Sequence, residues 1–281
     1  GMQSVSMEGH QVAVVTGGNR GIGFEIARGC AELGFRVVLC ARAPDKGERA
    51  AQTLGCEFLR LDLDDATSIS EAAQELARRH GQIDVLVNNA ALAYKHADTT
   101  PWTQKARTTV NTNVFGTLAV CEAFFPLLRE GGRVVNVASM AGHLSILPTE
   151  SLKCKFAEAD STLTTRQVVQ LMTQFVQDVE ECRSTASAPS PSWPHVAKGW
   201  PSNSYGMSKL AQVALTKIHA RELAPRGIAV NCCCPGSVAT GMNPRGARTA
   251  AQGADTPVWL AAQRAKAATG QFFKDRVAVA W

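Results

Sequence analysis

The chain has 281 residues, which is longer than one average domain of about 150 residues and shorter than two. Hydrophobic residues make up 45% and charged residues 19%, and these fractions exclude disordered, collagen-like and coiled-coil proteins. No apolar run approaches the roughly 20 residues of a membrane helix, so no membrane association is expected. The net charge of +5 is spread without a basic run, which predicts no nucleic-acid partner but suits an anionic small ligand.

The nine cysteines are scattered and form no Cys-x-x-Cys pair, so we expect no metal site. Several lie in strand-like apolar runs, where cysteine behaves as a small buried hydrophobe, and free thiols indicate a reducing compartment. Residues 1–10 lack the apolar core of a signal peptide and are expected to form a flexible N-terminus. The simplest location is therefore the cytoplasm.

Short apolar runs rich in β-branched residues alternate with stretches of helical periodicity along the chain. Strands are predicted at 12–16, 37–40, 58–61, 85–87, 134–137 and 228–233, and helices at 21–33, 46–54, 68–79, 102–128 and 204–223. Strands that are apolar throughout and alternate with helices indicate a parallel sheet covered on both faces. The prediction is one α/β domain, 1–281, with a Rossmann-like doubly wound sheet.

Residues 140–204 break this alternation, because they contain no candidate strand. Thr164 and Gln167 form a capping-box pattern, and apolar residues then recur at helical spacing over 168–179. A loop dense in Ser, Pro and Ala follows at 184–194. We therefore expect a helical insertion at 140–204.

The first strand runs into Thr-Gly-Gly-Asn-Arg-Gly-Ile-Gly at 16–23, where the first helix begins. Gly17, Gly21 and Gly23 let the backbone turn tightly and approach a pyrophosphate, and the helix N-terminus supplies unpaired N–H groups. Such a cluster on its own often only joins a strand to a helix. After the first strand of an α/β chain it predicts a dinucleotide site.

The end of the second strand distinguishes the two nicotinamide cofactors. An NAD site usually carries an acidic residue there, whereas this strand ends at Arg42, and Lys46 follows. Arg20 lies inside the glycine loop, so three cations and no carboxylate favour the 2′-phosphate of NADP(H). Alternatively these are solvated surface residues, as Lys and Arg usually are.

Polar residues also follow later strands. Asn89 and Ser139 stand at carboxyl ends of strands, which is the edge where open parallel sheets bind ligands. The Ser139 hydroxyl can donate to a substrate carbonyl oxygen. Asn113 lies inside a predicted helix, where asparagine either distorts the hydrogen-bond ladder or faces solvent. Each of these residues also has an ordinary structural explanation as a cap or turn residue.

Tyr205-Gly206-Met207-Ser208-Lys209 is the most informative motif, because residues four apart share one face of a helix. The ammonium of Lys209 and an oxidised nicotinamide would lower the pKa of Tyr205 toward neutral pH and make it an effective proton donor. The same spacing is common on solvated helix faces, so the motif gains its meaning from the residues above.

Together these motifs resemble those of the short-chain dehydrogenase/reductase family, whose pattern is Thr-Gly-x-x-x-Gly-x-Gly, Asn-Asn-Ala-Gly, then Asn, Ser and Tyr-x-x-x-Lys. The chain departs from this pattern at Ala91, which replaces the last glycine of Asn-Asn-Ala-Gly. Within the family it resembles the monomeric NADPH-dependent carbonyl reductases in stretches such as 199–202, 233–236 and 270–272. Ser237 stands where those reductases carry tryptophan.

The resemblance implies a role for each matched residue. Tyr205 would be the proton donor, Lys209 would hold the nicotinamide ribose, and Ser139 would orient the substrate carbonyl. Asn113 would support a water-linked proton relay to Lys209. NADPH or NADP+ would be bound by Tyr205 and Lys209 and by Gly17, Asn19, Arg20, Gly21, Ile22, Gly23, Arg42, Lys46, Asp62, Leu63, Asn89, Pro235, Gly236, Val238 and Thr240.

The implied function is NADPH-dependent reduction of aldehydes, ketones or quinones. Met140, Trp200 and Met242 would give the pocket apolar walls for a small apolar or aromatic carbonyl substrate. The insertion would cover the helices through which most family members pair, which predicts a monomer. Two alternatives stay open: an NADP-dependent alcohol or hydroxysteroid dehydrogenase that works oxidatively, and a non-catalytic NADPH-binding sensor.

Overall fold

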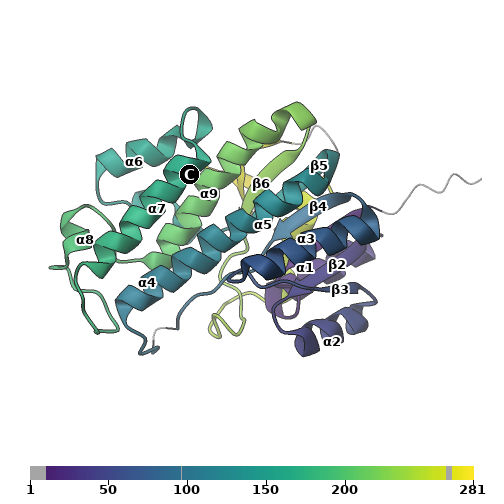
Figure 1. The fold of residues 1–281 in the computed structure, drawn as a ribbon, viewed down its shortest axis with the longest axis horizontal. Coiled ribbons are helices and arrows are strands. Elements are labelled where there is room, and N and C mark those ends of the chain that lie inside the picture. Colours follow the sequence, from purple (N-terminus) through teal and green to yellow (C-terminus); the bar gives the residue numbers. More distant parts are fainter. Residues whose placement is uncertain (1–10, 96, 264–267) are drawn as a thin grey trace, which may run out of the picture.

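Eight strands form one sheet in the order β3-β2-β1-β4-β5-β6-β7-β8 (Figure 1). The computed structural model describes residues 11–95, 97–263 and 268–281, so the N-terminus expected to be flexible, 1–10, lies outside the described residues. The strands are β1 Val12–Thr16, β2 Arg36–Ala41, β3 Glu57–Arg60, β4 Ile83–Asn88, β5 Leu128–Val137, β6 Ala229–Cys234, β7 Phe272–Lys274 and β8 Val277–Val279. All neighbours pair in parallel except β7 and β8, which are antiparallel. The predicted doubly wound parallel sheet is confirmed, with a short edge hairpin that the sequence did not indicate.

Helices cover both faces of the sheet. They are α1 Gly21–Glu32, α2 Pro44–Leu54, α3 Ala66–His80, α4 Trp102–Val110, α5 Thr117–Phe124, α6 Glu150–Ala157, α7 Thr165–Glu180, α8 Pro194–Ala197, α9 Ser204–Leu223 and α10 Ala250–Ala261. Successive strand residues point to opposite faces, so Val12 and Val14 pack with α3 and α5 while Ala13 and Val15 pack with α1, α2 and α10. Because both faces of the sheet are buried, the central strands β1, β2, β4 and β6 consist mainly of buried apolar residues.

The prediction of one helix over 102–128 is wrong, because this segment is not a single regular α-helix. The segment is α4, then a π-helical turn over Asn111–Gly116, then α5 and a 3-10 turn over Phe125–Leu127, after which β5 begins at Leu128. Asn113 is fully buried in the π-helical turn, so of its two expected effects it is the distortion of the helix, not exposure to solvent, that the structure shows. Gly116, the last residue of this turn, lies close to the backbone of Leu63. A Cβ on Gly116 would lie 2.3 Å from the Leu63 carbonyl oxygen, so only glycine fits there.

The expected helical insertion lies between β5 and α9. Helix α7 begins with the predicted capping box, in which the Thr164 hydroxyl accepts from the Gln167 N–H and the Gln167 side chain accepts from the Thr164 N–H. Its apolar face, including Met172 and Phe175, packs in one core cluster with α4 and α9 (Figure 1). The short helices α6 and α8 were not predicted, because neither is long enough to show a clear helical period.

One carboxylate is buried in this cluster. Asp178 of α7 accepts hydrogen bonds from the Trp200 Nε1, at 2.7 Å, and from the Lys198 Nζ and Gln174 Nε2, each at 2.8 Å. Burial raises the pKa of this carboxyl, but the three hydrogen bonds outweigh it, so the pKa lies below its usual value. Asp178 therefore ties α7 to the segment that leads into α9.

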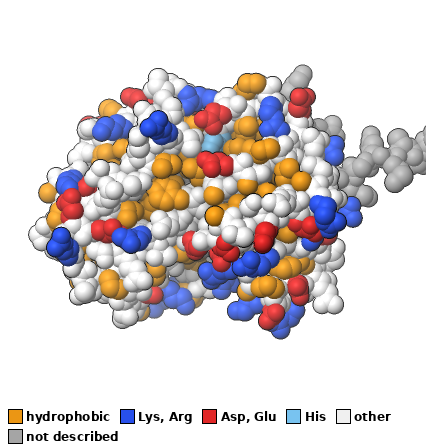
Figure 2. Space-filling view, in the orientation of Figure 1, with side chains coloured by type: hydrophobic (Ala, Val, Ile, Leu, Met, Phe, Trp, Pro, Cys, Tyr) orange, Lys and Arg blue, Asp and Glu red, His pale blue; other side chains and the backbone are white. Residues whose placement is uncertain are grey.

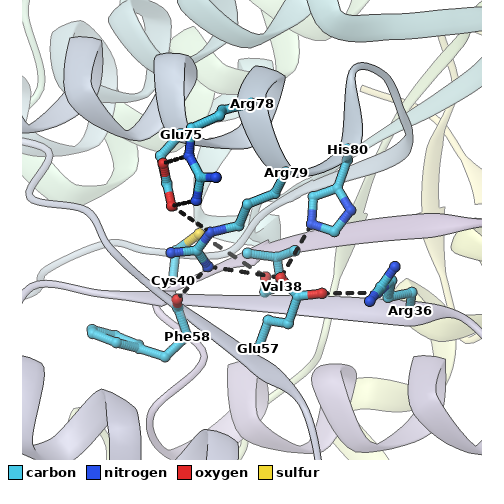
Figure 3. Close-up of polar contacts among 9 residues, drawn as sticks. All are labelled: Arg36, Val38, Cys40, Glu57, Phe58, Glu75, Arg78, Arg79 and His80. Atoms are coloured by element: carbon cyan, nitrogen blue, oxygen red, sulfur yellow. Dashed lines mark hydrogen bonds and ion pairs between the residues drawn. The ribbon is translucent and has the colours of Figure 1, made fainter.

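Charged side chains protect the exposed edge of the sheet at β3, as Figure 3 shows. Glu57 pairs with Arg36 of β2 at 2.8 Å, and Arg79 of α3 donates to the Phe58 carbonyl oxygen at 3.0 Å. Glu75 in turn accepts from Arg79 at 2.7 Å. The bond from Arg79 satisfies a backbone carbonyl at an edge that would otherwise be open to another strand. The whole charged group lies apart from the glycine loop.

The surface drawn in Figure 2 carries Lys and Arg side chains interspersed with Asp and Glu. Within the described ranges, no helix has both the length and the apolar character needed to cross a membrane. Among the same residues, no group of His, Cys, Asp or Glu side chains is arranged to hold a metal ion.

Replacing Asp178 by alanine is expected to lower the free energy of unfolding by about 2 to 3 kcal/mol, because the Trp200 Nε1 loses its partner inside the protein. The matched control is Glu181→Ala, since Glu181 also pairs with Lys198 but is 51% exposed and should contribute less than about 1 kcal/mol. Urea unfolding measures both values. Equal losses in the two variants would contradict the role given to Asp178.

Candidate active site

A cavity of about 1050 Å³ opens at the carboxyl edge of the sheet, where β1, β2, β4 and β5 end. The predicted site residues that line it are Gly17, Asn19, Arg20, Gly21, Ile22, Gly23, Arg42, Lys46, Asp62, Leu63, Asn89, Tyr205, Lys209, Pro235 and Thr240. This is the edge at which parallel α/β sheets bind their ligands. The structure therefore brings together, around one cavity, residues that lie far apart in the sequence.

Four of the predicted catalytic and cofactor-binding residues do not line the cavity. Asn113 is separated from the cavity by Leu92, whose N–H donates to the Asn113 side chain. Val238 is buried against Gly253 of α10, and a Cβ on Gly253 would lie 2.6 Å from the Val238 side chain. Gly236 lies beside Arg248, with a positive φ of 83°. Ser139 is half-buried at the end of β5, where its hydroxyl accepts from the Ala141 N–H at 3.1 Å, and it lies close enough to Tyr205 to lower the pKa of that phenol.

The glycine loop has the backbone that the sequence predicts for an anion site. Gly17 and Gly21 have φ values of 66° and 58°, which side-chain-bearing residues rarely adopt. A Cβ on Gly23 would lie 2.3 Å from the Gly17 carbonyl oxygen, so only glycine fits. None of the described side chains caps the first turn of α1, so its N–H groups remain available for a pyrophosphate.

Asn89 supports this loop directly. Its Nδ2 donates to the carbonyl oxygens of Thr16, at 2.9 Å, and Gly17, at 3.3 Å. Its backbone N–H donates to the Thr16 hydroxyl at 3.0 Å. Asn89 thus borders the cavity as predicted, and its amide also fixes the loop that would hold the cofactor.

Four cationic side chains surround the end of β2. Arg20, Arg42 and Lys46 are exposed and line the cavity, as the sequence predicts for a 2′-phosphate site. Arg49 lines it as well and was not predicted. Its signal was its position three residues after Lys46, on the same face of α2. The donor set fits an anion at this end of the cavity.

Tyr205 lies at the cavity in the first turn of α9. Burial raises the pKa of Tyr205 to about 12, and the nearby Cys234 thiol adds to the increase, while the neighbouring Ser139 side chain opposes it. The sequence predicted a lowered pKa, because the Lys209 charge and an oxidised nicotinamide were weighed without burial. In the chain alone, burial decides the direction.

Lys209 is 3% exposed and borders both Tyr205 and the cavity. Its Nζ lies 5.6 Å from the centre of the Tyr205 ring and donates to the Val137 carbonyl oxygen and the Gln212 Oε1, each at 2.8 Å. Burial lowers the pKa of Lys209 to about 8, although the Cys233, Cys234 and Cys232 thiols oppose the decrease. The expected Tyr205–Lys209 proximity is therefore present.

Asn113 reaches Lys209 through another side chain. The Asn113 Oδ1 accepts from the Leu92 N–H at 2.8 Å, which holds a residue of the cavity wall. The Asn113 carbonyl oxygen accepts from the Gln212 Nε2 at 2.9 Å, so Gln212 lies between Asn113 and Lys209. Gln212 was not predicted. Its signal was a polar side chain three residues after Lys209, in an otherwise apolar stretch of helix.

The apolar walls expected around the substrate are only partly present. Met242 lines the cavity and is 40% exposed. Met140 and Trp200 do not line it, so the expectation was wrong for both. Met140 is exposed, and the Trp200 ring packs against Phe175 in the core of the insertion, with 5.6 Å between ring centres. Ala91 lines the cavity, and Ser237 is exposed, where its hydroxyl accepts from Asn243.

Comparisons with known proteins agree with this geometry. The family model described as short chain dehydrogenase matches residues 11–149, and the one described as enoyl-(acyl carrier protein) reductase matches residues 192–269. Residues 150–191, which hold α6, α7 and the Ser- and Pro-rich loop, lie between the two matches. The segment that the two family models leave out is therefore the central part of the expected insertion, 140–204.

Similarity to individual proteins extends over nearly the whole chain. Carbonyl reductase (NADPH) 1 of Bos taurus is 40% identical over 284 residues, covering 96% of this chain and 98% of that protein. Carbonyl reductase (NADPH) 3 of Mus musculus is 40% identical over 286 residues, with the same coverage of 96% and 98%. The structure of salutaridine reductase from Papaver somniferum superposes with a TM-score of 0.82 at 29% identity, covering 95% of this chain and 100% of that chain. Because this likeness in sequence and fold extends over almost the full length of both chains, the chain belongs to the short-chain dehydrogenase/reductase family.

Proposed function

We propose that this protein reduces aldehydes, ketones or quinones to alcohols with NADPH, on small apolar or aromatic substrates. The observation that carries the proposal is one cavity bordered by the glycine loop, by the cations after β2 and by Tyr205 and Lys209. The relatives named carbonyl reductase (NADPH), at 40% identity over nearly the whole chain, support the same reaction and cofactor.

The chain's own residues divide the work between binding and proton transfer. The α1 N-terminus and the glycine loop would bind the pyrophosphate, and Arg20, Arg42, Lys46 and Arg49 would bind the 2′-phosphate. When bound, NADPH supplies the hydride for the carbonyl carbon. Tyr205 donates its phenolic proton to the carbonyl oxygen, while the Ser139 hydroxyl orients that oxygen.

Lys209 completes the proton donor. Its charged ammonium near the Tyr205 ring stabilises the phenolate that remains after proton transfer and would bind the nicotinamide ribose. The cations after β2, which suit NADP(H), and the relatives named carbonyl reductase (NADPH) support the reductase over an alcohol or hydroxysteroid dehydrogenase that works oxidatively.

A non-catalytic NADPH sensor is the alternative from another class. A sensor needs the glycine loop and the cations, but it has no use for Ser139 placed near Tyr205, with a buried Lys209 beside the Tyr205 ring. The arrangement of these three side chains therefore favours an enzyme. The free thiols, of which Cys30, Cys40 and others are buried, suit a cytoplasmic location.

Tyr205→Phe is expected to lower kcat for carbonyl reduction roughly 100- to 10,000-fold, because the proton donor is lost while the ring is kept. NADPH binding, followed by fluorescence, should be nearly unchanged. Tyr94→Phe is the matched control, because the only other tyrosine of the chain stacks near Lys105 and should keep normal turnover. Undiminished turnover in Tyr205→Phe would refute the mechanism.

Arg42→Ala is expected to raise the KM for NADPH about tenfold and to leave the KM for NADH nearly unchanged, because only NADPH carries the 2′-phosphate. Arg36→Ala, at the other end of β2, removes an equal charge that pairs with Glu57 outside the cavity and should alter neither value. Steady-state kinetics with both cofactors measures the difference. A parallel loss with NADH would show that Arg42 does not bind the phosphate.

The rate of reduction should depend on pH through Lys209. Its pKa of about 8 predicts that kcat/KM is level below that pH and falls above it, as the ammonium that stabilises the Tyr205 phenolate is lost. A pH profile measured with a neutral ketone checks this prediction. Activity that rose steadily above pH 8 would contradict it.

We also propose that the protein is a monomer. Helix α7 buries the apolar faces of α4 and α9, through which most relatives are expected to pair. Light scattering coupled to size exclusion should give a mass close to 29.9 kDa at all concentrations tested. A stable dimer or tetramer would contradict the role given to α7.

A further inference from the structure

The Lys209 ammonium has three N–H donors, and the described residues accept two of them. One goes to the Val137 carbonyl oxygen at the end of β5, and one goes to the Gln212 side chain. The remaining donor is left for the side where Lys209 borders the cavity and Tyr205. Lys209 is therefore oriented by two fixed acceptors.

Gln212 is itself held on every side. It is 3% exposed, its Oε1 accepts from Lys209 at 2.8 Å, and its Nε2 donates to the Asn113 carbonyl oxygen at 2.9 Å. Its backbone carbonyl oxygen accepts from the Thr216 hydroxyl, also at 2.8 Å. A buried amide with both ends engaged has one orientation, because turning it over would set donor against donor and acceptor against acceptor.

We propose that Gln212 is a positioning residue, which fixes the Lys209 ammonium between the end of β5 and the π-helical turn and thereby sets the pH range of carbonyl reduction. The inference rests on the proposed function. It names a residue outside the expected set of Asn113, Ser139, Tyr205 and Lys209.

Gln212 orients Lys209 but does not conduct protons between Lys209 and Asn113. To pass a proton, the amide would have to gain one at Oε1 and lose one from Nε2, which leaves the unfavourable imidic acid. Asn113 holds Gln212 in this place through its backbone carbonyl oxygen, which accepts from the Gln212 Nε2.

The titratable groups that face Lys209 should not obscure the titration of Lys209 itself in a pH profile. They are Tyr205 on α9 and the thiols Cys232, Cys233 and Cys234 of β6. Burial raises the pKa of Tyr205 and of Cys232 to about 12, and that of Cys233 well above its usual value. The Cys234 thiol is the same in every variant compared below.

Two substitutions of Gln212 are expected to shift the pKa of Lys209 in opposite directions. Gln212→Met keeps the length of the side chain but removes the oxygen that accepts from Lys209. The ammonium form of Lys209 is then less stable, so the pH at which activity falls on the basic side (the basic limb of the profile) should decrease by about one unit. Gln212→Glu places a carboxylate beside the ammonium and should raise that limb by about one unit. The measurements are kcat/KM and, independently of turnover, the NADPH dissociation constant, each from about pH 6 to about pH 10.

Thr216→Val is the matched control. It removes two buried hydrogen bonds, one that the Thr216 hydroxyl donates to the Gln212 backbone carbonyl oxygen and one that it accepts from Asn136, and it leaves in place the side-chain amide of Gln212 that holds Lys209. It should lower the melting temperature and leave the basic limb where it is in the unaltered chain.

The outcomes separate the possibilities. Opposite shifts for Gln212→Met and Gln212→Glu, with none for Thr216→Val, support the proposal. If Gln212→Met loses only stability and keeps the original limb in both measurements, Gln212 merely fills space and the proposal is overturned. If the unaltered chain reduces no carbonyl compound, the proposed function fails, and the pH dependence of NADPH binding still decides the role of Gln212.

Discussion

Lys209 places an ammonium group where little water reaches it. Two groups accept hydrogen bonds from this ammonium, and a third segment holds one of them in place. The end of β5 supplies the Val137 carbonyl, α9 supplies the Gln212 amide, and the π-helical turn secures Gln212 through the Asn113 carbonyl. A buried charge without such partners would cost several kcal/mol. The geometry of the candidate site therefore depends on keeping these three segments in register.

The same polar chain extends from α9 into the middle of the sheet. Thr216, which donates to the Gln212 backbone, accepts from the Asn136 side chain on β5, and Asn136 accepts from Asn88 on the neighbouring β4, each at 2.8 Å. Asn88 is thus a structural residue inside the sheet, while Asn89, its neighbour in sequence, holds the glycine loop. The two adjacent asparagines therefore contact different partners and have different structural roles.

Much of this arrangement could be predicted from sequence, because it follows from local periodicity and short motifs. The alternation of apolar strands and helices predicted the parallel sheet, and the bounds of α9 and the capping box of α7 agree with the pattern. The glycine loop and the Tyr205–Lys209 pair also lie where their spacing placed them. These features are local, so a single sequence contains the information for them.

What could not be predicted depends on contacts between distant segments. Periodicity gives no sign of a π-helical turn, and propensity alone left Asn113 between two interpretations. Gln212 has no motif of its own and becomes meaningful only when α9 is packed beside Asn113. The direction of the Tyr205 pKa required knowing how deeply the phenol is buried, and the place of Trp200 depended on Asp178, a residue 22 positions earlier in the chain.

The insertion also affects how this chain can change over evolutionary time. Both ends of its loop after α7 are tied down: the Ala186 carbonyl oxygen accepts from the Trp102 N–H, and Asp178 holds Trp200 before α9. Between these ties, α8 is anchored by the buried His195, but residues 187–192 before it are mostly exposed. This exposed part can gain or lose residues at a cost in chain entropy of only about 0.6 kcal/mol per doubling of its length, so the insertion can vary in length while the anchored segments around it stay in place.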